Sequence, residues 1–323
     1  GPERDYAAAR FMEVAEELIH IDIGIVRTGS REESEEAAKF VVLRVRQALD
    51  AALSITVPDL PRASRLLDLL DEVADFAGLD LSEVEGELAY RRLQIALAKN
   101  DDAAVSVAAA QLHRTEGLYA RSGDRLLYQH AVTRWQSRTT DADRALRVVS
   151  YGSRVLEQFE PLESHKNDAV ILGVINTVAA AATVVWQSEE EIDAGMLAVA
   201  IDMDTTLVAL GKQTATSLRR LALATEAAGD LDTALTSWNT LMAGLHDGSN
   251  GWFEARVESI RVLAQIDDRR ARAVLDQHRV LYPDLGPEPW GRQLQDLDHL
   301  LSGVVPAPDE ETSTPAQPEE DNG

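Results

Sequence analysis

The sequence predicts an all-α fold of about fourteen helices arranged as stacked antiparallel pairs, an α-solenoid. Proline is absent from 63 to 160 and again from 162 to 282, so long stretches of the chain can remain helical. Short clusters of Gly, Asp and Asn interrupt these stretches, as is typical of turns between helices. No long alternation of apolar and polar residues indicates a β-strand.

The composition excludes several classes of function. Hydrophobic residues make up 45% of the 323 residues, so the chain can bury a sizeable core. There are 31 basic and 55 acidic residues, and the formal net charge is -24. Nucleic acids and anionic membranes attract basic surfaces, so we expect no nucleic-acid partner. The absence of cysteine excludes disulfides, thiolate metal sites and cysteine nucleophiles.

Two long helices are predicted to form an N-terminal hairpin over residues 3–57. The first runs from about Arg4 to Arg27, and Ser30 with Glu33 has the spacing of a capping box before the second. Apolar residues recur at helical steps in the first helix at Phe11, Val14, Leu18, Ile21 and Ile25. In the second, which ends near Ile55, they include Phe40, Leu43, Ala48, Leu49 and Leu53. The turn Pro58-Asp59-Leu60-Pro61 predicts a domain boundary.

A helical repeat domain is predicted over residues 62–305. Its expected helices are 62–77, 81–99, 102–121, 124–138, 141–159, 166–187, 190–211, 214–228, 231–246, 251–266, 268–282 and 288–302. Residues 306–323 hold four prolines and six acidic residues but no basic or aromatic residue. Such a segment cannot bury enough apolar surface to order itself, so we expect a disordered acidic tail.

The chain contains one clear repeat unit, Leu218-x-x-Leu221-Ala222-x-x-Thr225, then Gly229-Asp230-Leu231-Asp232 and Ala234-x-x-x-Trp238. Its small residues Ala222 and Ala234 allow two helices to approach closely, while Leu218 and Trp238 fill the remaining volume. The spacing resembles the tetratricopeptide (TPR) repeat. A degenerate unit follows from about Trp252 to Pro283, with weaker matches around Ala104 and Ala145. A generic all-helical domain is the alternative.

The TPR resemblance implies a right-handed α-solenoid whose groove binds an extended peptide or helix of a partner protein. The chain would then be a non-catalytic interaction scaffold. The resemblance places seven residues in the groove: His130, Arg134, Arg138, Arg219, Glu226, Phe253 and Arg256. Arginine suits carboxylate recognition and phenylalanine suits apolar anchoring. The alternative for these residues is that they pair with local acidic residues and cover neighbouring helices.

A second hypothesis is a self-assembling structural subunit. The apolar rows of the N-terminal hairpin could dock on another copy of the chain and form a homo-oligomer. The same rows could instead pack inward on the helices that follow.

Two segments resemble a catalytic motif and a membrane span, respectively. Asp202-Met203-Asp204-Thr205 resembles the first motif of haloacid-dehalogenase-type phosphatases, but that motif requires the end of a strand, and the preceding residues favour helix. The uncharged run 169–188 has the length of a membrane span, yet Asn176 and two threonines interrupt it, which favours a buried helix. We therefore predict no catalytic residue, no metal, no cofactor and no membrane span.

Overall fold

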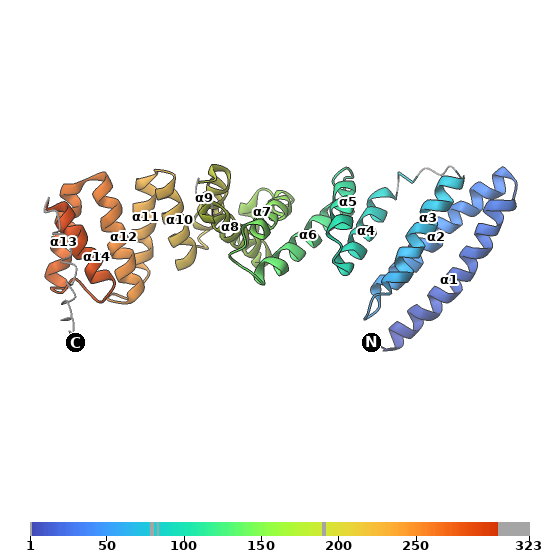
Figure 1. Cartoon of the computed structure of the whole chain (residues 1–323), viewed down its shortest axis with the longest axis horizontal. Coiled ribbons are helices and arrows are strands. Elements are labelled where there is room, and N and C mark those ends of the chain that lie inside the picture. Colours follow the sequence, from blue (N-terminus) through green and yellow to red (C-terminus); the bar gives the residue numbers. More distant parts are fainter. Residues whose placement is uncertain (1, 78–80, 83, 189–191, 303–323) are drawn as a thin grey trace, which may run out of the picture. The chain divides into compact units, whose positions relative to one another are not determined.

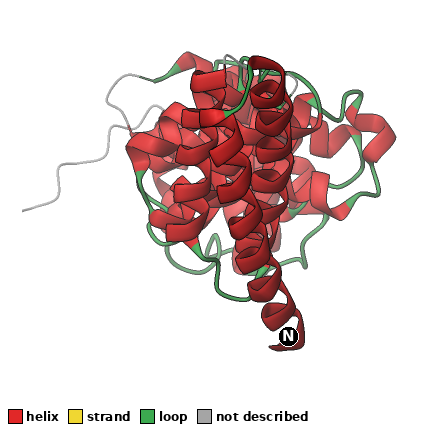
Figure 2. Cartoon of the chain, turned by 90° about the vertical axis from the view of Figure 1, so that its right-hand side faces the viewer, coloured by secondary structure: helices red, strands yellow, loops and turns green. Residues whose placement is uncertain are grey.

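The computed structural model describes residues 2–77, 81–82, 84–188 and 192–302. These residues form fourteen α-helices and one short 3-10 helix, with no strand among them (Figures 1 and 2), and the predicted all-α class is confirmed. The chain divides into two compact units, Gly1–Glu160 and Pro161–Gly323. The predicted acidic tail, 306–323, lies outside the described residues.

The described residues of the first unit form seven helices. They are α1 (Pro2–Thr28), α2 (Arg31–Ser54), α3 (Leu60–Ala77), α4 (Glu85–Lys99), α5 (Asp102–Leu112), α6 (Leu118–Gln136) and α7 (Ala142–Glu157). The helices α1 and α2 form the predicted hairpin, and the capping box of Ser30 and Glu33 begins α2. One apolar core joins α1, α2 and α3, so the turn at Pro58 to Pro61 lies within a unit and does not separate two.

The break between α5 and α6 differs from the predicted one. We expected a turn at Ser122 to Asp124, but these residues lie inside α6, and the chain turns at 113–117, where Gly117 has a φ of 96°. Gly123 serves close packing: a Cβ there would lie 2.8 Å from Cδ1 of the buried Leu112. A glycine within a helical pattern can mark close helix contact as well as a turn.

The second unit begins with the 3-10 helix η1 (Leu162–His165), and its described residues also form seven α-helices. They are α8 (Ala169–Ser188), α9 (Ala194–Ala209), α10 (Ala215–Ala227), α11 (Leu231–Ala243), α12 (Asn250–Ile266), α13 (Asp268–Leu281) and α14 (Trp290–Leu301). The four repeat residues Leu218, Ala222, Ala234 and Trp238 share one core cluster between α10 and α11.

The apolar helix α8 is the one described helix whose length and composition would allow it to cross a membrane. More than half of its most apolar window is buried, and α9 and α10 pack against it. The hydroxyls of Thr177 and Thr183 donate to the carbonyls of Gly173 and Ala179, one turn earlier in the same helix, both at 2.8 Å. These contacts are consistent with an interior helix, in which polar side chains satisfy their hydrogen bonds locally.

Candidate functional site: a pocket between α5, α6 and α7

A pocket of about 360 Å³ in the first unit brings together two of the predicted groove residues, His130 and Arg134. Both project from α6, and α5 and α7 form the other walls. The lining residues are Asp102, Val105, Ser106, Leu127, His130, Ala131, Arg134, Asp141, Asp143, Arg144, Arg147 and Tyr151.

The most buried residues of the pocket lining are apolar, and we call them its floor. Val105, Leu127 and Ala131 are buried, and the ring of Tyr151 is half-buried against the same core cluster. At the end of α6, the indole Nε1 of Trp135 donates to the Thr139 carbonyl at 3.0 Å and fixes the turn into α7. The polar rim therefore stands on a packed base, which is the usual construction of a binding pocket.

Two of the arginines on the rim are held by carboxylates. Arg134 Nη1 donates to Asp102 Oδ1 at 2.6 Å, which ties α6 to the first residue of α5. Arg144 Nε lies 3.2 Å from Asp141 Oδ2, and its Nη1 donates to the Arg134 carbonyl and the Ser137 hydroxyl, both at 2.9 Å. Asp141 also caps α7 by accepting from the Arg144 backbone amide. These contacts fix the guanidinium groups in defined positions.

A third arginine, Arg147, is exposed on α7 and differs from the other two. No carboxylate among the described residues lies within ion-pair distance of it. Asp143, one turn earlier on the same helix, likewise has no basic partner within the described part of the chain. The rim thus offers one cation and one anion that remain available to a ligand.

His130 adds a neutral hydrogen-bonding group. Burial lowers the pKa of its imidazole, and the positive charges of Arg134 and Arg147 lower it further, while Asp102 opposes them. The ring is therefore neutral at pH 7, with one donor and one acceptor nitrogen.

The third predicted residue of the first unit lies outside this pocket. The side chain of Arg138 is 69% exposed, and its Nη1 stands 4.0 Å from Asp141 Oδ2. Sequence spacing does not separate Arg138 from Arg134, because both follow His130 at steps of four residues on a predicted helix.

Two predicted groove residues of the second unit are held in ion pairs that join α10 to α12. Arg219 donates from Nε and Nη2 to the Glu254 carboxylate at 2.9 and 2.6 Å. Glu226 accepts from Nη1 and Nη2 of Arg261 at 2.5 and 2.6 Å. Both side chains are already satisfied within the protein, so neither offers a free charge to a partner.

The other two predicted groove residues of the second unit are partly or wholly buried in the protein. Phe253 is only 3% exposed and packs against Trp252, His278 and Tyr282, so it belongs to an aromatic core. Arg256 is half-buried; its Nη2 donates to the Val274 carbonyl at 3.2 Å, and burial lowers its pKa. The expectation that Phe253 anchors a ligand fails because its ring fills space between α12 and α13.

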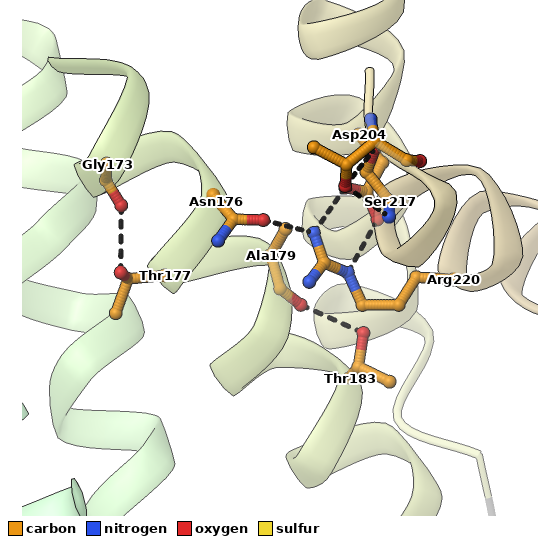
Figure 3. Close-up of polar contacts among 9 residues, drawn as sticks. Gly173, Asn176, Thr177, Ala179, Thr183, Asp204, Ser217 and Arg220 are labelled. Carbon is orange, nitrogen blue, oxygen red and sulfur yellow. Dashed lines mark hydrogen bonds and ion pairs between the residues drawn. The ribbon is translucent and has the colours of Figure 1, made fainter. Parts of the chain in front are cut away.

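A separate buried polar cluster lies among α8, α9 and α10 (Figure 3). Arg220 donates from Nη2 and Nε to the fully buried Asp204 carboxylate at 2.6 and 3.0 Å, and Nη2 also donates to Asn176 Oδ1 at 3.0 Å. Asp202, its neighbour in the phosphatase-like motif, is exposed on the same continuous helix. The two carboxylates therefore face different environments, and Asp204 acts as a structural ion-pair partner.

Neither a protein-family model nor a curated protein sequence matches this chain. The pocket is therefore interpreted from its own residues. Sequence reasoning missed Asp102, Arg144, Arg147 and Tyr151. The last three recur at steps of three and four residues, a signal that would have placed them on one face of α7. No group of three His, Asp or Glu side chains in the described ranges is arranged to hold a metal ion.

Proposed function

We propose that this protein is a non-catalytic protein-interaction scaffold whose pocket between α5, α6 and α7 binds a short segment of a partner protein. The observation that carries the proposal is the free guanidinium of Arg147 above an apolar floor, beside the neutral ring of His130. A pocket of about 360 Å³ is near the lower end of ligand sites, so it takes one or two side chains of a longer peptide.

The chemistry of the rim selects the peptide. Asp102 and Asp141 are already neutralised by Arg134 and Arg144, so the charges left for a ligand are those of Arg147 and Asp143. An acidic ligand side chain can form a charge-assisted hydrogen bond with Arg147, and an adjacent apolar side chain can cover the floor. We therefore propose a segment with an acidic residue next to an apolar one, bound with its backbone near His130.

The architecture that we propose around this pocket is a right-handed, TPR-like α-solenoid. Two ion pairs in the second unit support it: Arg219 with Glu254 and Glu226 with Arg261 each join residues that are 35 positions apart. Side chains at equivalent positions of consecutive repeats meet in this way when the first helices of neighbouring pairs stack. The spacing is close to the TPR period of about 34 residues.

A peptide array with matched variants tests the pocket. Arrayed peptides that combine acidic and apolar residues are probed with the unmodified protein, and the strongest is titrated by fluorescence polarisation. Arg147→Glu should weaken this binding about tenfold or more, since a hydrogen bond to a charged group contributes roughly 1.5–3 kcal/mol. Arg114→Glu is the control, because it makes the same charge change at an exposed site outside the pocket. If both variants weakened binding equally, the change in net charge would explain the effect, and the proposal would be contradicted.

A further inference from the structure

The helix α1 carries an apolar row that the first unit does not cover. Its members are Phe11, Val14, Leu18, Ile21 and Ile25, each between 39% and 60% exposed. The residues that α1 buries against α2 and α3 are a different set, which includes Met12, Ile19 and Val26. The alternative that the predicted rows pack inward is therefore wrong for α1, which turns this row to solvent. In α2 it holds for Ala48 and Leu49, which are buried.

The spacing of this row is that of a helix-helix seam. Its five residues follow steps of three, four, three and four, which is the heptad pattern of a coiled coil. At 1.5 Å per residue the row is about 21 Å long. Scattered exposed apolar residues are common on soluble proteins, but a continuous row of this length marks an interaction surface.

The adjacent helix α2 widens the row into a face. Arg44 Nη1 donates to the Leu18 carbonyl at 3.3 Å, and its guanidinium carbon lies 5.6 Å from the centre of the Phe40 ring. Phe40 and Leu43 are 45% and 47% exposed. Arg44 thus joins Phe40 to the middle of the row, and Leu43 precedes Arg44 on α2. We name the seven residues the hairpin face: Phe11, Val14, Leu18, Ile21, Ile25, Phe40 and Leu43.

The size and charge of the hairpin face fit a dimer. At about 150–200 Å² per fully exposed side chain, its seven residues present roughly 500–600 Å² per copy. Two copies would bury about 1,000 Å² from these side chains alone, which reaches the size of specific interfaces. Arg44, which lies between the row and Phe40, is already paired with Asp22, so it would not enter the interface as an unpaired charge.

We propose that the hairpin face is the two-fold interface of a homodimer. The α1 helices of the two copies pack antiparallel with Leu18 near the axis, and the α2 helices meet near Leu43. This arrangement places Phe11 against Ile25 of the second copy, and Val14 against its Ile21. Each contact occurs twice, as an isologous interface requires, and the antiparallel helix dipoles attract.

Cross-linking tests the geometry, because the chain has no cysteine and each introduced thiol is unique. Leu18→Cys and Leu43→Cys should each form a disulfide-linked dimer under mild oxidation. Phe11→Cys should not, because the antiparallel pairing separates the two copies of residue 11 by about 20 Å, and a disulfide needs Cα atoms within about 7 Å. Efficient cross-linking of Phe11→Cys would overturn the antiparallel arrangement.

Light scattering behind a sizing column tests the dimer itself. The unmodified chain should have twice the mass of its 35.3 kDa monomer, and the double variant Leu18→Glu/Ile21→Glu should have the monomer mass. Val280→Glu, at an 82% exposed site on α13, is the control and should remain dimeric. Circular dichroism verifies that each variant is folded. A monomeric unmodified chain at about 100 μM, or a double variant that remains dimeric, would overturn the proposal.

Discussion

Arg220 donates two hydrogen bonds, of 2.6 and 3.0 Å, to the carboxylate of Asp204, which is wholly buried between α9 and α10. Burial raises the pKa of Asp204, and the hydrogen bonds and charge of Arg220 oppose this rise. The third contact, from Arg220 to Asn176, brings α8 into the same cluster. One guanidinium group therefore connects three consecutive helices of the second unit.

Removal of one partner from this ion pair should be costly. Arg220→Met leaves an uncompensated carboxylate in the interior, so we expect the free energy of unfolding to fall by about 3–5 kcal/mol. Replacing both partners, as Asp204→Leu/Arg220→Met, removes the buried charge and should recover much of this loss. Urea unfolding monitored by circular dichroism measures both changes. A double variant no more stable than Arg220→Met would show that the pair does not act as a unit.

Gly291 should tolerate no side chain. A Cβ at this position in α14 would lie 2.5 Å from the Gly286 carbonyl oxygen, and the backbone there cannot move away without shifting the loop before α14. We expect Gly291→Ala to lower the free energy of unfolding by about 1–3 kcal/mol. Gly173→Ala is the matched control, since no atom other than the neighbouring backbone of α8 lies within 4 Å of the added methyl group. That variant should be neutral or stabilising by up to about 1 kcal/mol in the same urea titration.

The stability of the protein should fall in mild acid because of His278. Burial lowers the pKa of this histidine below its ordinary 6.5, and Arg256 adds to the effect, while the bond to the Leu285 carbonyl opposes it. Between the lowered folded pKa and 6.5 the unfolded chain binds more protons, so the free energy of unfolding decreases as the pH falls through this window. Urea titrations at about pH 7.5 and about pH 5.5 measure the decrease.

The variant His278→Gln removes this titration and should reduce the pH dependence. His246→Gln, at an exposed site in the loop after α11, is the control and should keep the dependence of the unmodified protein. An identical pH dependence in the unmodified protein and His278→Gln would assign the effect to other groups.

Peptide binding in the pocket should become tighter in mild acid, whereas the stability of the protein should fall. The pKa of His130 lies below its ordinary 6.5 in the free protein, so acid adds a positive charge beside Arg147. An acidic peptide should bind more tightly at about pH 5.5 than at about pH 7.5, because its carboxylate favours the protonated ring. His130→Gln should abolish this difference. The same difference in His130→Gln would place the titrating group elsewhere.

Much of the secondary structure was predictable from local signals. The capping-box spacing of Ser30 and Glu33 predicted the start of α2. The long stretches without proline indicated helices, and the described residues form fourteen of them. The break before α6 was not predictable, because the need for a glycine at position 123 comes from Leu112 on another helix. Sequence periodicity found one apolar row on α1, from Phe11 to Ile25, but it missed the face with Met12 and Ile19 that the fold buries.

The candidate site was predictable only in part for a similar reason. His130 and Arg134 were placed by the TPR resemblance, and they line the same pocket. The partners of Arg219 and Glu226 are 35 residues away, so their ion pairs depend on how the helix pairs stack. Phe253 was assigned to a surface from its position in the repeat, but its burial depends on Trp252, His278 and Tyr282. Tertiary contacts decided each of these cases.

The most direct test of the interaction scaffold is a charge-reversal titration at Arg147. The strongest acidic peptide from the array, and its copy with lysine at the acidic position, are each titrated against the unmodified protein and Arg147→Glu by fluorescence polarisation. We predict that the acidic peptide favours the unmodified protein and that the lysine peptide favours Arg147→Glu, about tenfold in each case. The same preference order in both proteins would contradict recognition at this pocket.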